Sequence, residues 1–212
     1  GLVYAPLGPT HIAIDDIGLM RTQPNMTIVS PADADEMARF MRTTLDWRGP
    51  IYIRLGKGGD PIISDDNPDF KIGKAIIHRP SSNVTIASSG IMSAKALEAA
   101  EIIKAKGINC GVIHFPTIKP IDTDAVCHMA EISELVVTLD EHLINNGLGS
   151  AVLETLHDEW NGTMPKIKRL GIRDQFTRHY GTQDTLLEQF GLQPHQIANF
   201  IERIARDARA AE

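Results

Sequence analysis

The residues with the clearest capacity for chemistry form the short run Gly8-Pro9-Thr10-His11, near the start of the chain. A Gly-Pro pair interrupts strand hydrogen bonding, so the backbone is expected to turn here. Thr10 is a suitable N-cap for a helix over residues 12–21. This helix would hold the His11 imidazole at its N-terminus, where the ring can donate or accept a proton near neutral pH. The alternative is that His11 is a partly exposed turn residue without a chemical role.

Glycines, acids and a histidine follow a later predicted strand. Gly147 and Gly149 precede a predicted helix, whose free backbone N–H groups can bind an anion. The third glycine of a dinucleotide fingerprint and the lysine of a P-loop are missing, which favours close helix–strand packing as the reason for these glycines. His142 stands beside Asp140 and Glu141. Since neighbours on a strand point to opposite faces, we favour a structural or interface role for His142 over a metal site or a general base.

Three further candidate side chains lie in apolar surroundings. His114 interrupts an apolar run and is expected to be a core histidine. Cys110 lies in the same run and Cys127 in a predicted helix, without the CxxC spacing of a metal site or redox pair. We expect both to be buried free thiols, which indicates a reducing compartment and a cytoplasmic protein.

Helices and strands alternate from the start of the chain. The pattern predicts a strand over residues 26–29, a helix that Ser30 caps, and a strand over residues 51–55. Together with the first helix, these elements make half of a parallel α/β domain, in which ligands gather at the carboxyl ends of strands. The apolar residues expected to form the buried face of the second helix are Met37, Phe40, Met41 and Leu45.

A second, longer α/β unit follows a segment rich in proline, aspartate and asparagine at residues 60–69. We expect a complete three-layer α/β/α domain around a mostly parallel five-stranded sheet. Residues 116–120 contain two prolines and are expected to form a loop. The predicted strands cover residues 74–78, 83–88, 108–115, 135–139 and 166–172, and the predicted helices cover residues 91–106, 122–132, 151–160, 182–190 and 195–208.

The composition narrows the class of protein. The 212 residues carry a net charge of −6 and no basic stripe, which argues against a nucleic-acid partner. No apolar stretch is long enough to span a membrane. The first seven residues resemble the middle of a domain, so we expect a fragment of a longer protein. The expected division is a partial domain at residues 1–60, a linker at 61–72 and a complete domain at 73–212.

These motifs, taken in order, resemble the transketolase family. Those before the linker resemble the second half of the pyrimidine-binding domain of transketolase and of 1-deoxyxylulose-5-phosphate synthase. Those after it resemble the C-terminal domain of the same enzymes, which β subunits of 2-oxo acid dehydrogenases share. The similar runs are residues 8–11, 16–21, 24–26, 30–33, Glu36 and 49–54 in the first part, and residues 89–90, 119–122, 140–142 and 147–150 in the second.

The resemblance implies thiamine diphosphate chemistry in the complete enzyme. In this family the cofactor lies between two subunits, and an N-terminal domain holds its diphosphate and Mg²⁺. By resemblance, His11 is a catalytic and substrate-binding residue, and Arg54 binds the phosphate of the sugar substrate. An imidazole can hydrogen-bond a hydroxyl or alkoxide, and the arginine fork suits a phosphate. The implied partner is a second copy in a homodimer or an N-terminal cofactor-binding subunit or segment.

Parts of the family's machinery are not found in this sequence. No Gly-Asp-Gly metal motif occurs, and the family's catalytic glutamate would precede Gly1. We therefore expect the chain alone to bind neither cofactor nor metal and to be inactive, and we assign no cofactor-binding or metal-binding residue. Leu7 replaces an aspartate that the family carries before its Gly-Pro-Thr-His motif, so the substrate pair stays open.

The favoured function is that of the C-terminal section of a transketolase, which transfers a two-carbon ketol unit between sugar phosphates. One alternative is a β-type subunit of a 1-deoxyxylulose-5-phosphate synthase or a 2-oxo acid dehydrogenase. The other is a non-catalytic α/β module for dimerisation or anion binding.

Overall fold

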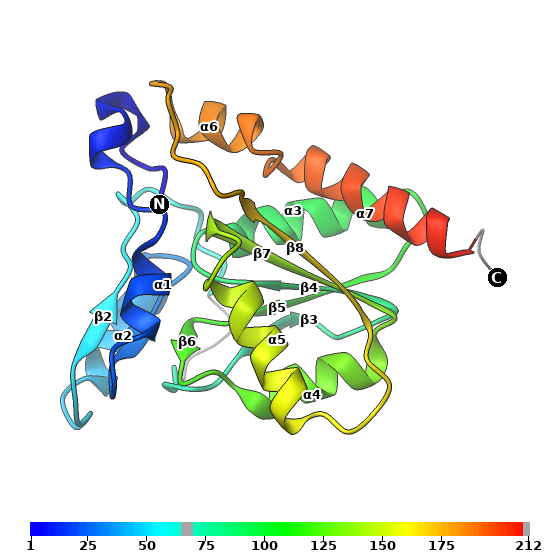
Figure 1. The fold of residues 1–212 in the computed structure, drawn as a ribbon, viewed down its shortest axis with the longest axis horizontal. Helices are drawn as coiled ribbons and strands as arrows, with labels where there is room; N and C mark the ends of the chain where they lie inside the picture. The colour runs from blue at the N-terminus through cyan, green and yellow to red at the C-terminus, as the bar shows by residue number, and fades with distance from the viewer. Residues whose placement is uncertain (65–69, 210–212) are drawn as a thin grey trace.

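The computed structural model describes residues 1–64 and 70–209, with side chains up to residue 206. Its larger part is a five-stranded sheet between two helical layers (Figure 1). The sheet is parallel except for one edge strand, β3, which confirms the predicted three-layer domain. In spatial order the strands are β3 (Ile76–Arg79), β5 (Cys110–His114), β4 (Val84–Ser88), β7 (Leu135–Leu143) and β8 (Lys166–Ile172).

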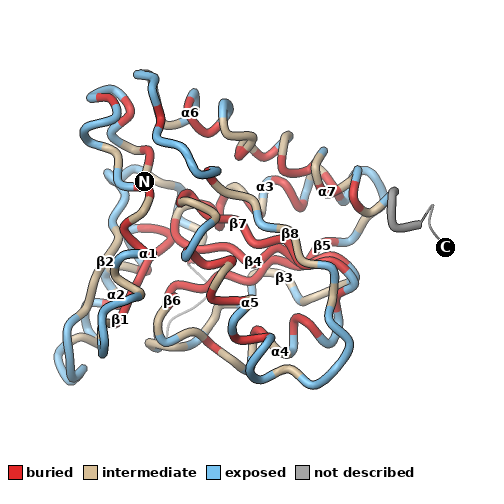
Figure 2. Tube along the Cα trace, viewed as in Figure 1, coloured by how far each residue is buried: buried red, intermediate tan, exposed pale blue. Residues whose placement is uncertain are grey.

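Helices cover both faces of this sheet, and a separate apolar core lies under each layer. Strand residues alternate between the two cores, so Val112 faces one layer and Ile113 the other. The central strands are buried along their length (Figure 2), as expected for parallel strands covered on both sides. One layer holds α3 (Met92–Lys104), α6 (Gln183–Gln189) and α7 (Pro194–Arg209), and the other holds α4 (Thr123–Ile132) and α5 (Leu148–Glu159).

The first sixty residues form a smaller unit packed against the larger one. Strand β1 pairs parallel with β2 and antiparallel with β6, a strand contributed by the second half of the chain. The elements are η1 (Ala5–Leu7) and η2 (Pro9–His11), both 3-10 turns, then α1 (Asp16–Arg21), β1 (Thr27–Val29), α2 (Ala34–Thr43) and β2 (Ile51–Ile53), with β6 at Thr117–Lys119.

Strand β6 lies in the segment predicted to be a loop, so that prediction is wrong. Two flanking prolines suggested an irregular segment, but the strand between them has only three residues. Ile118 is 2% exposed and packs against Ile17 and Ile28 of the smaller unit. Its burial and the pairing with β1 are contacts distant in sequence, which local proline signals do not reveal.

The first helix begins at Asp16, four residues later than predicted. The carbonyls before it are used in tertiary hydrogen bonds instead of helical ones. The Ile14 carbonyl accepts from the Leu143 N–H at the end of β7 (2.7 Å), and the Ala13 carbonyl accepts from Arg54 Nη2 (3.2 Å). Thr10 is therefore not an N-cap, and His11 does not lie at a helix N-terminus.

The second helix also departs from its prediction. Asp33, not Ser30, is the N-cap, since its Oδ1 accepts from the Glu36 N–H at 2.9 Å. Phe40 is buried, but Met41 and Leu45 are 46% and 84% exposed. The packed face follows Phe40, which contacts Val29 and Phe70, and Leu45 lies beyond the end of the helix.

The predicted linker at residues 61–72 includes residues 65–69, which lie outside the described residues. Next to that gap, the Ser64 N–H donates to Asp33 Oδ2 at 3.0 Å, and the Phe70 ring lies 5.3 Å from the Phe40 ring. The described ends of this segment thus pack on the smaller unit. The division at residues 1–60 and 73–212 stays a prediction. No helix within the described ranges has the length and apolar character needed to cross a bilayer.

Candidate active site

His11 lies on an exposed turn that η1 and η2 build. The two 3-10 turns meet at Gly8, which has a φ of 78°. This positive φ favours glycine, and a Cβ at Gly8 would also lie 2.4 Å from the ring of the exposed Tyr180. His11 Nδ1 lies 2.9 Å from Thr10 Oγ1, and no hydrogen bond among the described residues uses Nε2. The Nε2 atom is therefore available to an external oxygen.

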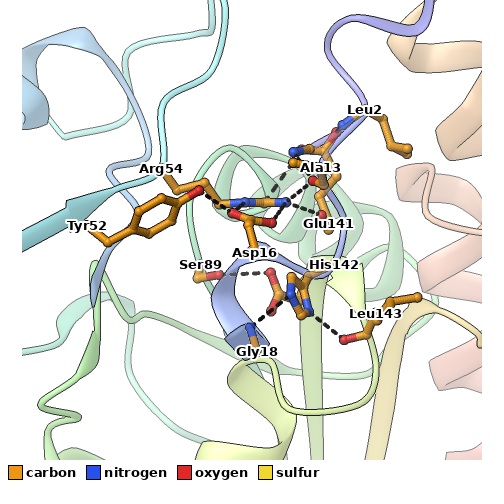
Figure 3. A network of polar contacts seen from close by, with 12 residues as sticks. Leu2, Ala13, Asp16, Gly18, Tyr52, Arg54, Ser89, Glu141, His142 and Leu143 are labelled. Carbon is orange, nitrogen blue, oxygen red and sulfur yellow. Dashed lines mark hydrogen bonds and ion pairs between the residues drawn. The ribbon is translucent and has the colours of Figure 1, made fainter. Parts of the chain in front are cut away.

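Arg54 follows strand β2 and lies in the centre of a buried polar network (Figure 3). Its side chain is 10% exposed. Nε donates to Asp16 Oδ2 at 2.9 Å, and Nη2 donates to the Glu141 carbonyl at 2.8 Å. Nη1 lies 3.9 Å from the Glu141 carboxylate. The guanidinium therefore faces two carboxylates of its own chain.

The space beside Arg54 is small. The cavity that Arg54 lines with Ser30 and Glu141 has a volume of about 20 Å³, roughly the space that one water needs. In this structure a phosphate does not fit beside the guanidinium. The phosphate contact that the resemblance implies for Arg54 stays a prediction, and it needs this network to open.

Asp16 and Glu141 connect Arg54 to other segments of the chain. The Tyr52 hydroxyl donates to Asp16 Oδ2 at 2.9 Å. The Leu2 N–H and the Gln183 side chain both donate to Glu141 Oε1, at 2.9 and 2.6 Å. One buried network thus ties β2, α1, the end of β7, the first residues and the start of α6 together. Sequence reasoning missed it, and the only local signal was an acid in the first turn of α1.

Burial and neighbouring charges shift the pKa values of two groups in this network. Burial acts to raise the pKa of Asp16, but the charge of Arg54 and the hydrogen bonds from Arg54 and Tyr52 outweigh it, and the pKa is lowered. Burial and the nearby Asp16 carboxylate raise the pKa of Tyr52 to about 12. Asp16 is therefore a stable anion, and Tyr52 stays a protonated donor at neutral pH.

The lowered pKa of Asp16 predicts a loss of stability in acid. A carboxylate with a folded pKa below its unfolded value stabilises the fold above the unfolded value, near 3.8, and this contribution disappears as pH falls through the folded pKa. Urea unfolding between pH 6 and pH 3 should show this loss, and Asp16→Asn should reduce it. An equal acid dependence in the wild type and Asp16→Asn would contradict the assignment.

Asp140 and His142 occupy structural positions at the end of β7. The Leu148 N–H at the start of α5 donates to Asp140 Oδ2 at 3.0 Å. His142 Nδ1 lies 2.7 Å from the Leu143 carbonyl, and its Nε2 accepts from the Gly18 N–H at 3.3 Å. A neutral imidazole protonated at Nδ1 satisfies both contacts. This confirms the predicted structural role of His142.

The glycines that follow β7 allow this close approach. A Cβ at Gly147 would lie 2.8 Å from Asp140 Oδ2 and 2.9 Å from His142 Nδ1. A Cβ at Gly149 would lie 2.6 Å from Thr138 Oγ1 on β7. Close helix–strand packing therefore explains both glycines, as predicted. The Asp140 carboxylate occupies the α5 N-terminus, where an external anion would bind.

A second buried polar cluster joins the two units. Glu36 Oε2 on α2 lies 3.0 Å from His114 Nε2 on β5, and His114 Nδ1 lies 2.7 Å from Ser93 Oγ on α3. His114 is fully buried, which confirms it as a core histidine. Its pairing with Glu36 was not predicted. The spacing of Asp33 and Glu36, which is that of a capping box, is the one signal that turns Glu36 back toward the chain.

The remaining candidates form no metal site among the described residues, where no three His, Cys, Asp or Glu side chains gather to hold an ion. Cys110 is a buried free thiol, and burial raises its pKa to about 12. Cys127 is a free thiol on α4 but only half-buried, so the prediction that both are buried is wrong for Cys127. Its neighbour His128 is exposed, so this part of α4 borders solvent.

Family models match both the mostly parallel α/β/α domain and the smaller unit, whose three-stranded sheet includes β6. The family model of the transketolase C-terminal domain matches residues 73–197, and that of the transketolase pyrimidine-binding domain matches residues 1–59. The chain belongs to the transketolase family. The two domain matches confirm the resemblance in its motifs.

Over the aligned residues, the chain is about one third identical to several curated relatives. It is 35% identical over 203 residues to a putative transketolase C-terminal section of Methanocaldococcus jannaschii, covering 95% of this chain and 62% of that protein. It is 38% identical to the 6-deoxy-6-sulfo-D-fructose transketolase subunit SqwH of a Clostridium species, covering 90% and 58%. It is 33% identical to a 1-deoxy-D-xylulose-5-phosphate synthase of Heliobacterium modesticaldum, covering 97% and 31%. The chain thus spans less than two thirds of each relative.

A solved structure supports the same assignment. The chain superposes on a split gene transketolase, described as an inactive beta4 tetramer, with a TM-score of 0.83 and 36% identity. The match covers 92% of this chain and 62% of that one. The transketolase of Pichia stipitis shares the fold, with a TM-score of 0.72 at 17% identity.

Proposed function

We propose that this chain supplies the substrate-facing part of a thiamine diphosphate-dependent transketolase, which transfers a two-carbon ketol unit between sugar phosphates. The exposed position of His11 carries the proposal. The Thr10 hydroxyl can donate to Nδ1, which keeps the ring proton on Nε2. An Nε2–H group on this turn can donate to a hydroxyl or alkoxide of the sugar, and it can return a proton at the same oxygen.

The described residues of this chain offer no site for the Mg²⁺-bound diphosphate of the cofactor. No metal-binding group of His, Cys, Asp and Glu gathers among them, and the guanidinium of Arg54 already faces Asp16 and Glu141. We therefore derive no cofactor step from this chain. We propose that a separate subunit or an N-terminal segment holds the diphosphate and Mg²⁺.

The names of two relatives support such a two-part enzyme. SqwH is named as a subunit of a 6-deoxy-6-sulfo-D-fructose transketolase, and a protein of Phocaeicola vulgatus is named as a subunit of an apulose-4-phosphate transketolase. A homodimer of the complete protein is the alternative assembly.

Leu7 leaves the identity of the sugar open within this proposal. Its side chain is 50% exposed on η1, four residues before His11, and it offers no hydrogen bond to a hydroxyl. A β-type subunit of a 1-deoxyxylulose-5-phosphate synthase is the second candidate, and the relative from Heliobacterium modesticaldum favours it. A role in anion binding at the α5 N-terminus is disfavoured, because Asp140 occupies that position. A cytoplasmic location accompanies the proposal, since the two free thiols suit a reducing compartment.

Isothermal titration calorimetry tests whether the cofactor is held outside this chain. The chain alone, with its fold checked by circular dichroism, should show no binding of thiamine diphosphate that requires Mg²⁺. A complete transketolase titrated under the same conditions is the positive control. Tight binding to this chain alone that requires Mg²⁺ would contradict the proposal, because the cofactor site would then lie within these residues.

A further inference from the structure

A groove with a concentration of positive charge lies between strand β8 and helix α7. It has a volume of about 1260 Å³ and shares no lining residue with the His11 turn or the Arg54 network. Among the described residues that line it, none is acidic, although the chain as a whole carries a net charge of −6. Five of the chain's 21 lysines and arginines line it: Lys166, Lys168, Arg169, Arg173 and Arg203.

The lysines stand on the face of β8 that α7 covers. Lys166, Lys168 and Leu170 are every second residue of the strand and therefore lie on the same face. Leu170 packs against the core beneath α7. The strand spacing places the two lysines about 7 Å apart along this face. Arg203, on α7, also lines the groove. Positive charges thus converge from two elements.

These cations are not neutralised by the described part of the chain. None of the ion pairs between described side chains involves any of the five. Arg169 is partly engaged, since its Nη1 donates to the Ile144 carbonyl at 2.8 Å. The other four side chains, on β8, on α7 and after β8, have no ion-pair partner among the side chains described at residues 1–64 and 70–206.

Two aromatic rings complete the groove. Phe190 and Phe200 are both half-buried and line it, and the Arg203 guanidinium carbon lies 5.6 Å from the centre of the Phe200 ring. Lysine and arginine bind phosphates, the latter with a planar fork. Aromatic side chains stack on flat rings. We propose that the groove between β8 and α7 binds a small molecule that carries two or more phosphate groups and an aromatic ring.

A competing explanation is that the lysines protect an open edge. Strand β8 ends the sheet, and charged side chains on an edge strand prevent pairing with another chain. That role needs repulsion only. It predicts no saturable binding of a small polyanion, and it does not involve the phenylalanines or Arg203 on α7.

Isothermal titration with adenosine triphosphate and with tripolyphosphate, in Mg²⁺-free buffer of low ionic strength, separates the two explanations. Both probes should bind at one site, the nucleotide more tightly, and affinity should fall with added salt. Lys168→Ala should weaken both by about tenfold. Phe200→Leu should weaken only the nucleotide. Lys71→Ala, which removes the same charge from an exposed position outside the groove, should leave both affinities unchanged.

Three results would overturn the proposal. One is absence of saturable binding in the wild type, with Lys168→Ala changing only the oligomeric state, as edge protection predicts. Another is an equal loss of affinity in Lys168→Ala and Lys71→Ala, which would reflect net charge alone. A third is equal affinity for the two probes, unaffected by Phe200→Leu, which would exclude a ring-binding site.

Discussion

Replacing Arg54 with methionine is expected to lower the free energy of unfolding by about 3–5 kcal/mol, because it leaves buried charges without a partner. The side chains of Asp16 and Glu141 are 9% and 5% exposed and both face the guanidinium. Methionine fills part of the volume but supplies neither charge nor donors. Urea unfolding followed by circular dichroism measures the loss.

Matched variants isolate the ion pair from general effects of the substitution. Arg42→Met removes an arginine from the exposed surface of α2 and should change stability by less than about 0.5 kcal/mol. Adding Asp16→Asn to Arg54→Met should cost less than the sum of the two single changes, since the residues interact directly. A loss below about 1 kcal/mol for Arg54→Met would show that the network does not hold the two units together.

Replacing His11 with alanine is expected to lower kcat/KM of the reconstituted enzyme by about 10²- to 10⁴-fold, the usual contribution of a positioned acid or base. Stability should stay unchanged, because the side chain is exposed and its one described hydrogen bond is to the neighbouring Thr10. His11→Gln, which keeps a hydrogen-bond donor, should recover part of the activity. Steady-state kinetics with a ketose phosphate donor measures these values.

Control variants separate the role of His11 from that of histidines in general. His195→Ala changes an exposed histidine on α7 and should leave kcat/KM unaltered. Thr10→Val should lower it less than His11→Ala, because only the partner of Nδ1 is removed. A kcat/KM for His11→Ala within twofold of the wild type would contradict a substrate-side role.

Periodicity in the sequence was sufficient to predict the larger domain. Mostly apolar runs at β5 and at the start of β7 are typical of strands covered on both faces, and the spacing of Met92, Ala96 and Ala99 indicates the buried side of α3. These are local signals whose meaning does not depend on distant residues. Most of the observed helices and strands of the larger domain accordingly differ from the predicted ones in their first or last residue, but they follow in the predicted order.

Features fixed by contacts distant in sequence were not predictable. The late start of α1 depends on carbonyls at residues 13 and 14 that bond Arg54 and Leu143, and β6 depends on pairing with β1. The site shows the same limit. A short motif identified His11, but nothing near Arg54 in the sequence reveals that Asp16 and Glu141 face its guanidinium.

Reconstitution of ketol transfer tests the central claim most directly. The chain is mixed with the N-terminal, thiamine diphosphate-binding section of a split transketolase, a ketose phosphate donor and an aldose phosphate acceptor. The donor shortened by two carbons and the acceptor lengthened by two are then followed by mass spectrometry. We predict both products only when the two sections are combined, and their loss with His11→Ala. Turnover by this chain alone, or equal turnover with and without His11, would contradict the account.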